Sequence, residues 1–417
     1  NTPRGRFTDY AALIVVPLVL FGVIVGFAPN FVPTDEVRQH PLGGDFLQEY
    51  AGGALYRDQQ QNNQLYNIDV CREFQHNEML LRFKWDESNF FPMVYPPFYY
   101  AAVSPLSRLE YLTAARIWLF LMTVFLIGGL LILKFSLRIP TGWLLLACVT
   151  APILLSLTTG QKSSLLFLIL TATWASYRAD KPFMAGAIFG LIAFKPHLGI
   201  PIGLFMLARK QWSFVLGCYF TVGCLIVGSF MTGFDICTDY IDVTMGFSNY
   251  VHNSGYHLEQ GFSLWSAWQL AVGDDMVARI LTILCSIMVF GGTAWFLRQP
   301  GCWQGDNLSR SFSAMTLATL LVAPHLYAYD LSMLVLPAIL LADIAIRNPG
   351  NRMDLAPVIA LAIVLFGMNL LIAFGSVTGL NLGVPLLVAV WVWTLKSVLP
   401  QGPASDSVAV AVPAQAS

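Results

Sequence analysis

The sequence predicts an all-α protein that crosses a membrane many times, and three observations support this fold class. Of the 417 residues, 56% are hydrophobic and only 11% are charged, so most of the chain cannot form a water-facing surface. Apolar runs recur along the chain at about the length that a helix needs to cross a bilayer. Lys and Arg collect in alternate loops between these runs. Backbone groups inside a bilayer must be satisfied within the chain, which favours helices.

About a dozen segments are apolar enough to be membrane helices, although several are too short to cross alone. They are residues 10–28, 112–133, 142–158, 163–177, 183–195, 197–208, 212–232, 276–297, 311–324, 328–346, 355–375 and 381–397. The first run has no small-residue cleavage site after it, so we expect a retained span and not a signal peptide.

The positions of Lys and Arg orient these segments, since cytoplasmic loops of membrane proteins carry an excess of positive charge. With the N-terminus inside, the inner loops hold Arg4 and Arg6, Lys134 and Arg138, Arg178 and Lys181, Arg209 and Lys210, Arg298 and Arg310, Arg347 and Arg352, and Lys396. Both termini are then cytoplasmic. Two segments stay ambiguous in this scheme, Tyr95–Leu106, which is re-entrant or interfacial, and Gly261–Ala271.

The long first outer loop, residues 31–111, has structure of its own in this prediction. Residues 44–58 and 68–83 mix apolar and polar positions in a way that suits helices lying on the membrane surface, with a polar break at 57–64 between them. We expect one transmembrane domain over residues 1–400. Residues 401–417, rich in small residues, are expected to be a disordered cytoplasmic tail.

Charge and cysteine content exclude some partners. The net charge is -1 and no Lys/Arg cluster is present, which argues against binding nucleic acid. The seven cysteines contain no CxxC pair, and no His/Cys/Asp group has metal-ligand spacing. No cofactor is expected, while metal dependence stays open. Cys71 and Cys237 are the two cysteines in outer loops; a disulfide and a pair of free thiols are both open.

The polar residues near membrane depth gather on the outer side of this topology. They are Asp45, Glu49, Lys195, His197, His325 and Asp330. Ionisable groups at membrane depth are costly and are commonly functional. This asymmetry predicts an active site that faces outward.

Two segments have the features of an anion site. In FKPHLG, Pro196 breaks the apolar run and brings helix ends, Lys195 and His197 together. In TTGQKSSLL, the helix start at Gln161 offers free backbone N–H groups to a phosphate. The alternatives are a proline kink with a snorkelling lysine and a simple helix start.

Three other segments also have a functional and a structural interpretation. In VAPHLYAYDL, His325 and Asp330 lie at the outer end of two spans, where a lone histidine is often structural. YPPFYY, starting at Tyr95, suits an interfacial aromatic belt as well as a sugar or lipid contact. Asp45 follows Gly43 and Gly44, which allow close backbone approach, and its alternative role is a helix N-cap.

The order of these motifs resembles that of the GT-C glycosyltransferases that use polyprenyl-phosphate sugars, specifically glycosyltransferase family 87, which includes the mycobacterial phosphatidylinositol mannoside mannosyltransferases. The matching motifs, over about 320 residues, are Asp45, Phe46, Tyr50, Gly53, Ala54 and Leu55 of DFxxxYxxGAL, YPPF at Tyr95, GQ at Gly160, KP at Lys195 and PH at Pro324. The late turn PHLYAYDL lacks the tryptophan and the paired histidines of some relatives.

The resemblance implies an inverting transferase, in a bacterial inner membrane, that moves a sugar, most simply mannose, from a polyprenyl-phosphate donor to a lipid or glycan acceptor on the periplasmic side. Asp45 would be the general base. The donor phosphate would contact Lys195, His197, His325 and Gln161. Other substrate contacts would come from Glu49, Tyr50, Tyr95, Tyr256, His257, Tyr329 and Asp330. The alternative from another class is a multispan transporter or flippase, whose sites usually lie near mid-membrane between internal repeats.

Overall fold

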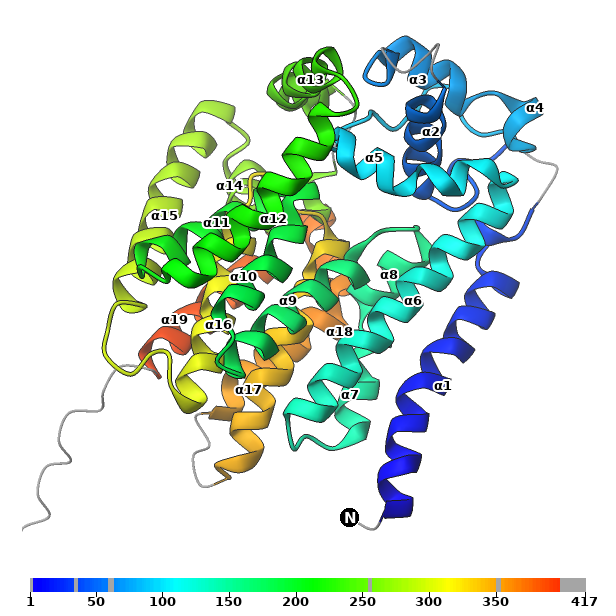
Figure 1. The fold of residues 1–417 in the computed structure, drawn as a ribbon. Helices are drawn as coiled ribbons and strands as arrows, with labels where there is room; N and C mark the ends of the chain where they lie inside the picture. The colour runs from blue at the N-terminus through cyan, green and yellow to red at the C-terminus, as the bar shows by residue number, and fades with distance from the viewer. Residues whose placement is uncertain (1–2, 34–36, 59–63, 254–256, 350–353, 398–417) are drawn as a thin grey trace, which may run out of the picture.

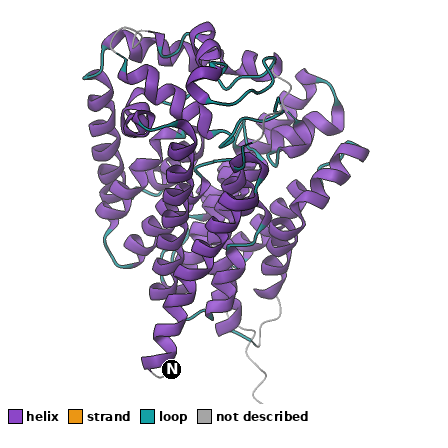
Figure 2. Ribbon diagram, turned by 90° about the vertical axis from the view of Figure 1, so that its right-hand side faces the viewer, coloured by secondary structure: helices purple, strands orange, loops and turns teal. Residues whose placement is uncertain are grey.

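The computed structural model describes residues 3–33, 37–58, 64–253, 257–349 and 354–397. Within these residues the chain is built of helices joined by loops, and no strand is present (Figure 2). The predicted all-α class is therefore confirmed. The expected tail, residues 401–417, and Tyr256 lie outside the described residues.

The first helix, α1 (Pro3–Phe27), packs beside the long helix α6 (Tyr111–Ser136). The chain between them forms a helical cap at the end of the molecule opposite the N-terminus (Figure 1). Its helices are η1 (Pro29–Phe31), α2 (Phe46–Arg57), α3 (Ile68–Gln75), α4 (Glu78–Leu81), α5 (Pro97–Val103) and η3 (Ser104–Arg108). Helices were predicted at 44–58 and 68–83, and both regions are helical, the second in two pieces.

The middle of the chain consists mainly of short helices that begin or end at prolines. They are α7 (Thr141–Ala147), α8 (Ala151–Thr158), α9 (Ser163–Arg178), α10 (Pro182–Gly190), η4 (Leu191–Phe194), α11 (Pro196–Ala208) and α12 (Trp212–Phe230). Proline suits a first helical turn, where its missing N–H has no intrahelical partner. Pro196 thereby starts α11 directly after Lys195, at the break that the sequence predicted.

The remaining elements complete the bundle. They are α13 (Phe234–Asn253), η5 (Leu258–Gln260), α14 (Leu264–Val272), α15 (Asp275–Phe296), α16 (Gly305–Val322), η6 (Ala328–Leu334), α17 (Val335–Arg347), α18 (Leu355–Thr378) and α19 (Gly383–Lys396). Of these, α13 lies beside the cap formed by α2–α5 (Figure 1).

Every predicted membrane segment corresponds to a helix or to a pair of helices, which makes the chain a multispan membrane protein. Among the described residues, six helices are long and apolar enough to cross a bilayer: Thr8–Phe27, Tyr111–Ser136, Trp212–Phe230, Asp275–Phe296, Ala328–Arg347 and Leu355–Thr378. A seventh is formed if α7 and α8, bent by 49°, count as one broken span. The predicted total of about 12 remains a prediction.

One of the six candidate spans, Ala328–Arg347, lies at the centre of the bundle. In its most apolar window 78% of the residues are buried, against 17% for the span in α1. The helices around it shield it from lipid, so this span can carry polar side chains that a lipid-facing helix cannot. Its first segment, η6, carries Tyr329 and Asp330.

Candidate active site

The loop before α2 packs tightly against the turn between α8 and α9. Gly43 and Gly44 have φ values of +72° and +60°, and Gly160 has a φ of +70°, a region in which glycine avoids the cost of a Cβ atom. A Cβ on Gly44 would overlap the Thr159 backbone, and one on Gly160 would overlap the carbonyl oxygen of Gly43. The two glycines before Asp45 therefore allow two backbones to touch.

This contact places Asp45 in the site. Its backbone N–H donates to the Thr159 carbonyl at 2.8 Å, and its carboxylate accepts a hydrogen bond from the Gln161 amide. Asp45 occupies the N-cap position of α2, but its side chain makes no capping bond. The N-cap alternative is thus wrong for the carboxylate, which is held by a residue 116 positions away.

Asp45 is also accessible and electrostatically perturbed. Among residues 41–50 it is the only one that is not buried. Loss of hydration raises the pKa of its carboxyl group from 3.8 to about 6, against the opposing effects of the Lys162 charge and the Gln161 hydrogen bond. A carboxylate with a pKa near the working pH is suited to general base catalysis.

Glu49, one helical turn after Asp45, forms an ion pair with Lys162. The two side chains are 0% and 1% exposed, so both charges are buried. The Lys162 ammonium also lies 3.9 Å from the centre of the Tyr95 ring and 5.6 Å from that of Tyr99. Both tyrosines belong to YPPFYY and are buried against Lys162, so they do not form a membrane-facing belt.

Lys162 and Tyr99 were not among the predicted site residues. A signal for Lys162 was present, because it follows the outer turn at Gln161 and so departs from the positive-inside trend, as Lys195 does. Tyr99 offered no signal beyond its place in an aromatic run.

Lys195 forms a second buried ion pair, with Asp330 in η6. The ammonium and carboxylate are 2.7 Å apart, and the two side chains are 6% and 3% exposed. The Lys195 ammonium also lies 5.2 Å from the centre of the Tyr329 ring. A lysine that snorkelled to the surface would be exposed, so that alternative is wrong, and the ion pair joins segments 135 residues apart.

Two histidines adjoin this second pair. His197, on the first turn of α11, lies close enough to Lys195, Asp330 and His325 to interact with their charges. His325 packs edge-to-face on Tyr327 with ring centres 5.5 Å apart. Burial lowers the pKa of His325 to about 4, so its imidazole is neutral at pH 7. A neutral imidazole can donate one hydrogen bond to a phosphate oxygen, but it adds no positive charge.

The two ion pairs and Asp45 belong to one cluster. Tyr95 lies between the two ion pairs. Its hydroxyl interacts electrostatically with Asp45 and with members of both pairs, namely Glu49, Lys195 and Asp330. Asp45 in turn interacts with the charges of Lys162, Glu49 and Lys195. The structure thus joins residues from five segments that the sequence had singled out separately, including Gln161 and Tyr329.

Two of the other predicted site residues are engaged elsewhere. The Tyr50 hydroxyl donates to the Leu109 carbonyl at 2.9 Å, and its ring packs at 90° on that of Tyr111. The His257 imidazole lies 3.1 Å from the Glu259 carboxylate and is exposed, although its backbone hydrogen-bonds Tyr327 at the edge of the cluster. Substrate contacts by Tyr50 and His257 remain predictions.

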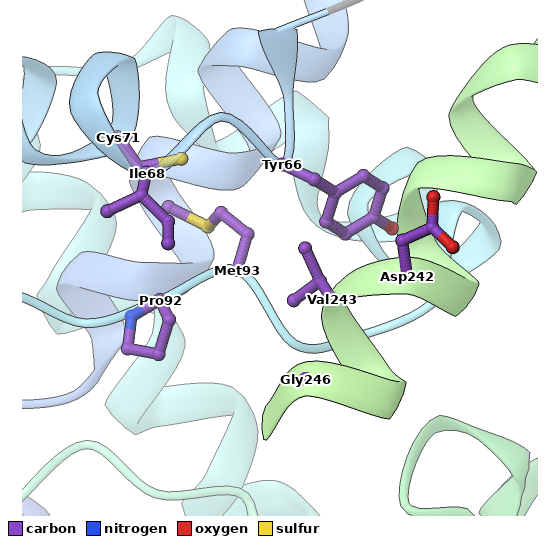
Figure 3. A pocket seen from close by; sticks show the side chains of 8 residues that line it. All are labelled: Tyr66, Ile68, Cys71, Pro92, Met93, Asp242, Val243 and Gly246. Atoms are coloured by element: carbon purple, nitrogen blue, oxygen red, sulfur yellow. The ribbon is translucent and has the colours of Figure 1, made fainter. Parts of the chain in front are cut away.

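A pocket of about 340 Å³ lies beside the cluster, between the helical cap and α13. Figure 3 shows the side chains of Tyr66, Met93 and Val243 facing it, with Asp242 at its side. The Tyr66 hydroxyl donates to the Tyr95 carbonyl at 2.7 Å, which links the pocket wall to the segment that lies against Lys162.

The structure also shows how the possible metal ligands and the two outer-loop cysteines are arranged. In the described ranges, no group of three or more His, Cys, Asp or Glu residues is arranged to hold a metal ion. Cys71 and Cys237 are both free thiols, and the Cys71 thiol donates to the Leu65 carbonyl at 3.2 Å.

Comparison with known proteins identifies the chain. No curated protein and no solved structure matches it. The family model for glycosyltransferase family 87 matches residues 93–324, which is more than half of the chain and includes Tyr95, Gln161, Lys162 and Lys195. Asp45 and Asp330 lie outside the matched range but contact residues within it. The resemblance seen in the motifs is thereby confirmed: the chain is a membrane protein that belongs to glycosyltransferase family 87.

Proposed function

We propose that this glycosyltransferase moves a sugar, mannose in the first instance, from a polyprenyl-phosphate donor to a lipid or glycan hydroxyl, with inversion at the sugar carbon. The observation that carries the proposal is the cluster itself. It holds an accessible carboxylate, Asp45, together with two buried lysines, Lys162 and Lys195, whose charges reach it. A base and a phosphate-binding cation are the two groups that such a transfer needs.

The reaction balances with these groups. The acceptor oxygen attacks the anomeric carbon and gives its proton to Asp45. The bond between that carbon and the phosphate oxygen breaks as the new bond forms. The polyprenyl phosphate leaves with one more negative charge than it had as a diester. A cation that neutralises this added charge stabilises the transition state more than the ground state, which is the condition for catalysis.

Lys195 is the residue we assign to the phosphate. It directly precedes α11, so the positive end of that helix dipole adds to the field of its ammonium group. His197 and His325 flank it and can hydrogen-bond the phosphate oxygens as neutral imidazoles. Asp330 would hold the Lys195 ammonium in place between turnovers.

One buried acceptor atom fits a sugar or an acceptor alcohol. The side-chain amide oxygen of Gln161, Oε1, accepts no hydrogen bond from the part of the chain that the structure describes. Buried polar atoms of this kind are costly unless they are satisfied. Hydroxyl groups of the bound substrate would supply donors next to Asp45, which Gln161 already contacts.

The location follows from the charge pattern of the loops. With Lys and Arg in the inner loops, the cluster opens on the extracytoplasmic side of a bacterial inner membrane. A polyprenyl-phosphate sugar presents its head group at that membrane surface. Mannose as the sugar rests on the likeness to the mycobacterial mannosyltransferases. Family membership favours this enzyme over the transporter.

The test is sugar transfer by the purified protein, with labelled polyprenyl phosphate mannose and a lipid extract as acceptor. Asp45→Asn keeps the shape of the side chain and removes the base, so we expect a loss of about 10²–10⁴-fold in rate. Asp69→Asn is the matched control, because Asp69 is an exposed aspartate of α3 in the same outer loop. Equal rates in wild type and Asp45→Asn would refute the assignment of the base. Transfer from a glucose-bearing donor alone would refute mannose.

A further inference from the structure

Two contacts join the start of α2 to the turn before α9. Asp45 and Glu49 are four residues apart and lie on one face of the chain as α2 begins. They contact two consecutive residues, Gln161 and Lys162 respectively. The base is therefore bound to the same short segment as the buried ion pair.

The pair is sealed from water while the base is not. Glu49 and Lys162 are 0% and 1% exposed, whereas Asp45 is partly exposed. Charges without intervening solvent are screened little, so both members of the pair act on Asp45. The rings of Tyr95 and Tyr99 also lie close to the Lys162 ammonium, and the cation–π attraction helps to hold it in position.

A buried ion pair such as this one is weak evidence for a role in stability. Replacing a buried ion pair with neutral residues of similar size is often neutral or stabilising, because desolvation offsets the attraction of the charges. The pair nevertheless lies one turn from the carboxylate to which we assign the base. Its electrostatic effect on that carboxylate is the role that its position supports.

We propose that Glu49 and Lys162 are positioning residues that set the ionisation of Asp45, with Lys162 favouring the carboxylate and Glu49 limiting the effect of Lys162. The catalytic meaning of this inference rests on the proposed function. Neither residue need touch the substrate for this role. It differs from the substrate contact that the family resemblance implied for Glu49.

Other groups also face Asp45. Lys195 adds a further positive charge, and Gln161 donates a hydrogen bond. The hydroxyls of Tyr95, Tyr111, Tyr327 and Tyr329 lie within electrostatic reach. Tyrosine ordinarily titrates at a pKa of about 10, so these four are neutral near pH 6. The charged groups that shape the titration of Asp45 are therefore Lys162, Glu49 and Lys195.

The test measures the ionisation of Asp45 without any substrate. A hydrophobic carbodiimide reacts with protonated carboxyl groups, and peptide mass spectrometry gives the extent of modification at Asp45 as a function of pH. Labelling of the wild type should fall with a half-point near pH 6. Lys162→Met removes the stabilising cation and should move the half-point up by about one pH unit. Glu49→Gln removes the negative charge that counteracts Lys162, so it should move the labelling half-point to lower pH.

Opposite shifts from two members of one ion pair cannot come from a general loss of packing. The double variant Glu49→Gln with Lys162→Met leaves no unpaired buried charge, so it should fold and give a half-point between those of the single variants. Arg310→Met, which breaks another largely buried pair, with Asp354, should leave the half-point unchanged. The proposal would be overturned if the labelling half-point shifted in the same direction in both single variants. It would also be overturned if the half-point shifted in none of the three variants.

The same variants separate this inference from the proposed function. If the labelling half-points shift as expected but the wild type transfers no sugar, the ionisation role stands and the function fails. If transfer requires Asp45 but the half-points do not move, the function stands and the role of the pair is refuted. Where transfer is measured, the acid limb of its pH profile should move in the same direction as the labelling.

Discussion

Gly160→Ala tests how the site is assembled, because Gly160 lies where the turn before α9 meets the loop of Asp45. Gly160 has a φ of +70°, and an added Cβ would be closer than 3.0 Å to the Gly43 carbonyl oxygen, nearer than real Cβ atoms come. The left-handed backbone costs an alanine about 1–2 kcal/mol. Overlap with a rigid backbone adds about 1–3 kcal/mol. The expected loss in the free energy of unfolding is about 2–5 kcal/mol.

Two other glycines separate these contributions. Gly273 has a φ of +71° but no atom within 4 Å of its Cβ position. Gly273→Ala should therefore lower the free energy of unfolding only by the cost of the left-handed backbone. Gly142 is helical and exposed with an empty Cβ position, so Gly142→Ala should be neutral or stabilising by about 0.5–1 kcal/mol.

The assay is unfolding by sodium dodecyl sulfate in mixed micelles, followed by circular dichroism, with sugar transfer measured on the folded fraction. We expect stability to fall in the order Gly142→Ala, Gly273→Ala, Gly160→Ala. Transfer should be lost only in Gly160→Ala, because the overlap displaces Gly43 and with it the contact between Asp45 and Gln161. Equal stability of the Gly160 and Gly273 variants would show that the two backbones do not touch, and the reasoning would fail.

Three further predictions concern pH, donor binding and thiols. The transfer rate should rise about tenfold per pH unit below pH 6 and level off above it, since Asp45 has a pKa of about 6 and acts as a carboxylate; a flat profile from pH 5 to 7 would contradict this. Lys195→Met with Asp330→Asn leaves no unpaired charge and should raise the KM for the donor at least about tenfold. Unchanged KM in that double variant would exclude Lys195 from the phosphate. Iodoacetamide added to the unreduced, denatured protein should modify Cys71 and Cys237, and absence of modification at both would indicate a disulfide.

The positions of the helices were predictable because they depend on local sequence. Apolar length and helix-breaking residues act within a few turns, so the segments around Pro196 and those in the first outer loop were found from the sequence. Lys195 could be singled out from the sequence, since an outer lysine departs from the charge rule, and the structure buries it in an ion pair. Lys162 carried the same signal but was interpreted as part of a helix start.

The partners of the polar residues were not predictable. Glu49 and Lys162 are 113 residues apart, and Lys195 and Asp330 are 135 apart, so no local pattern relates them. The sequence singled out Asp330 and Lys195 in separate motifs, and only the structure shows that they form an ion pair.

The sequence by itself therefore determined the class of the molecule, its helices, its family motifs and several of the ionisable residues that the fold brings together. Composition and periodicity suffice for these, because a bilayer imposes length and polarity on each segment independently. Only the tertiary structure decided which lysine meets which carboxylate and that Gln161, and not the end of α2, holds Asp45. Such contacts depend on how helices from distant parts of the chain pack, and on glycines whose backbones touch only in the folded molecule.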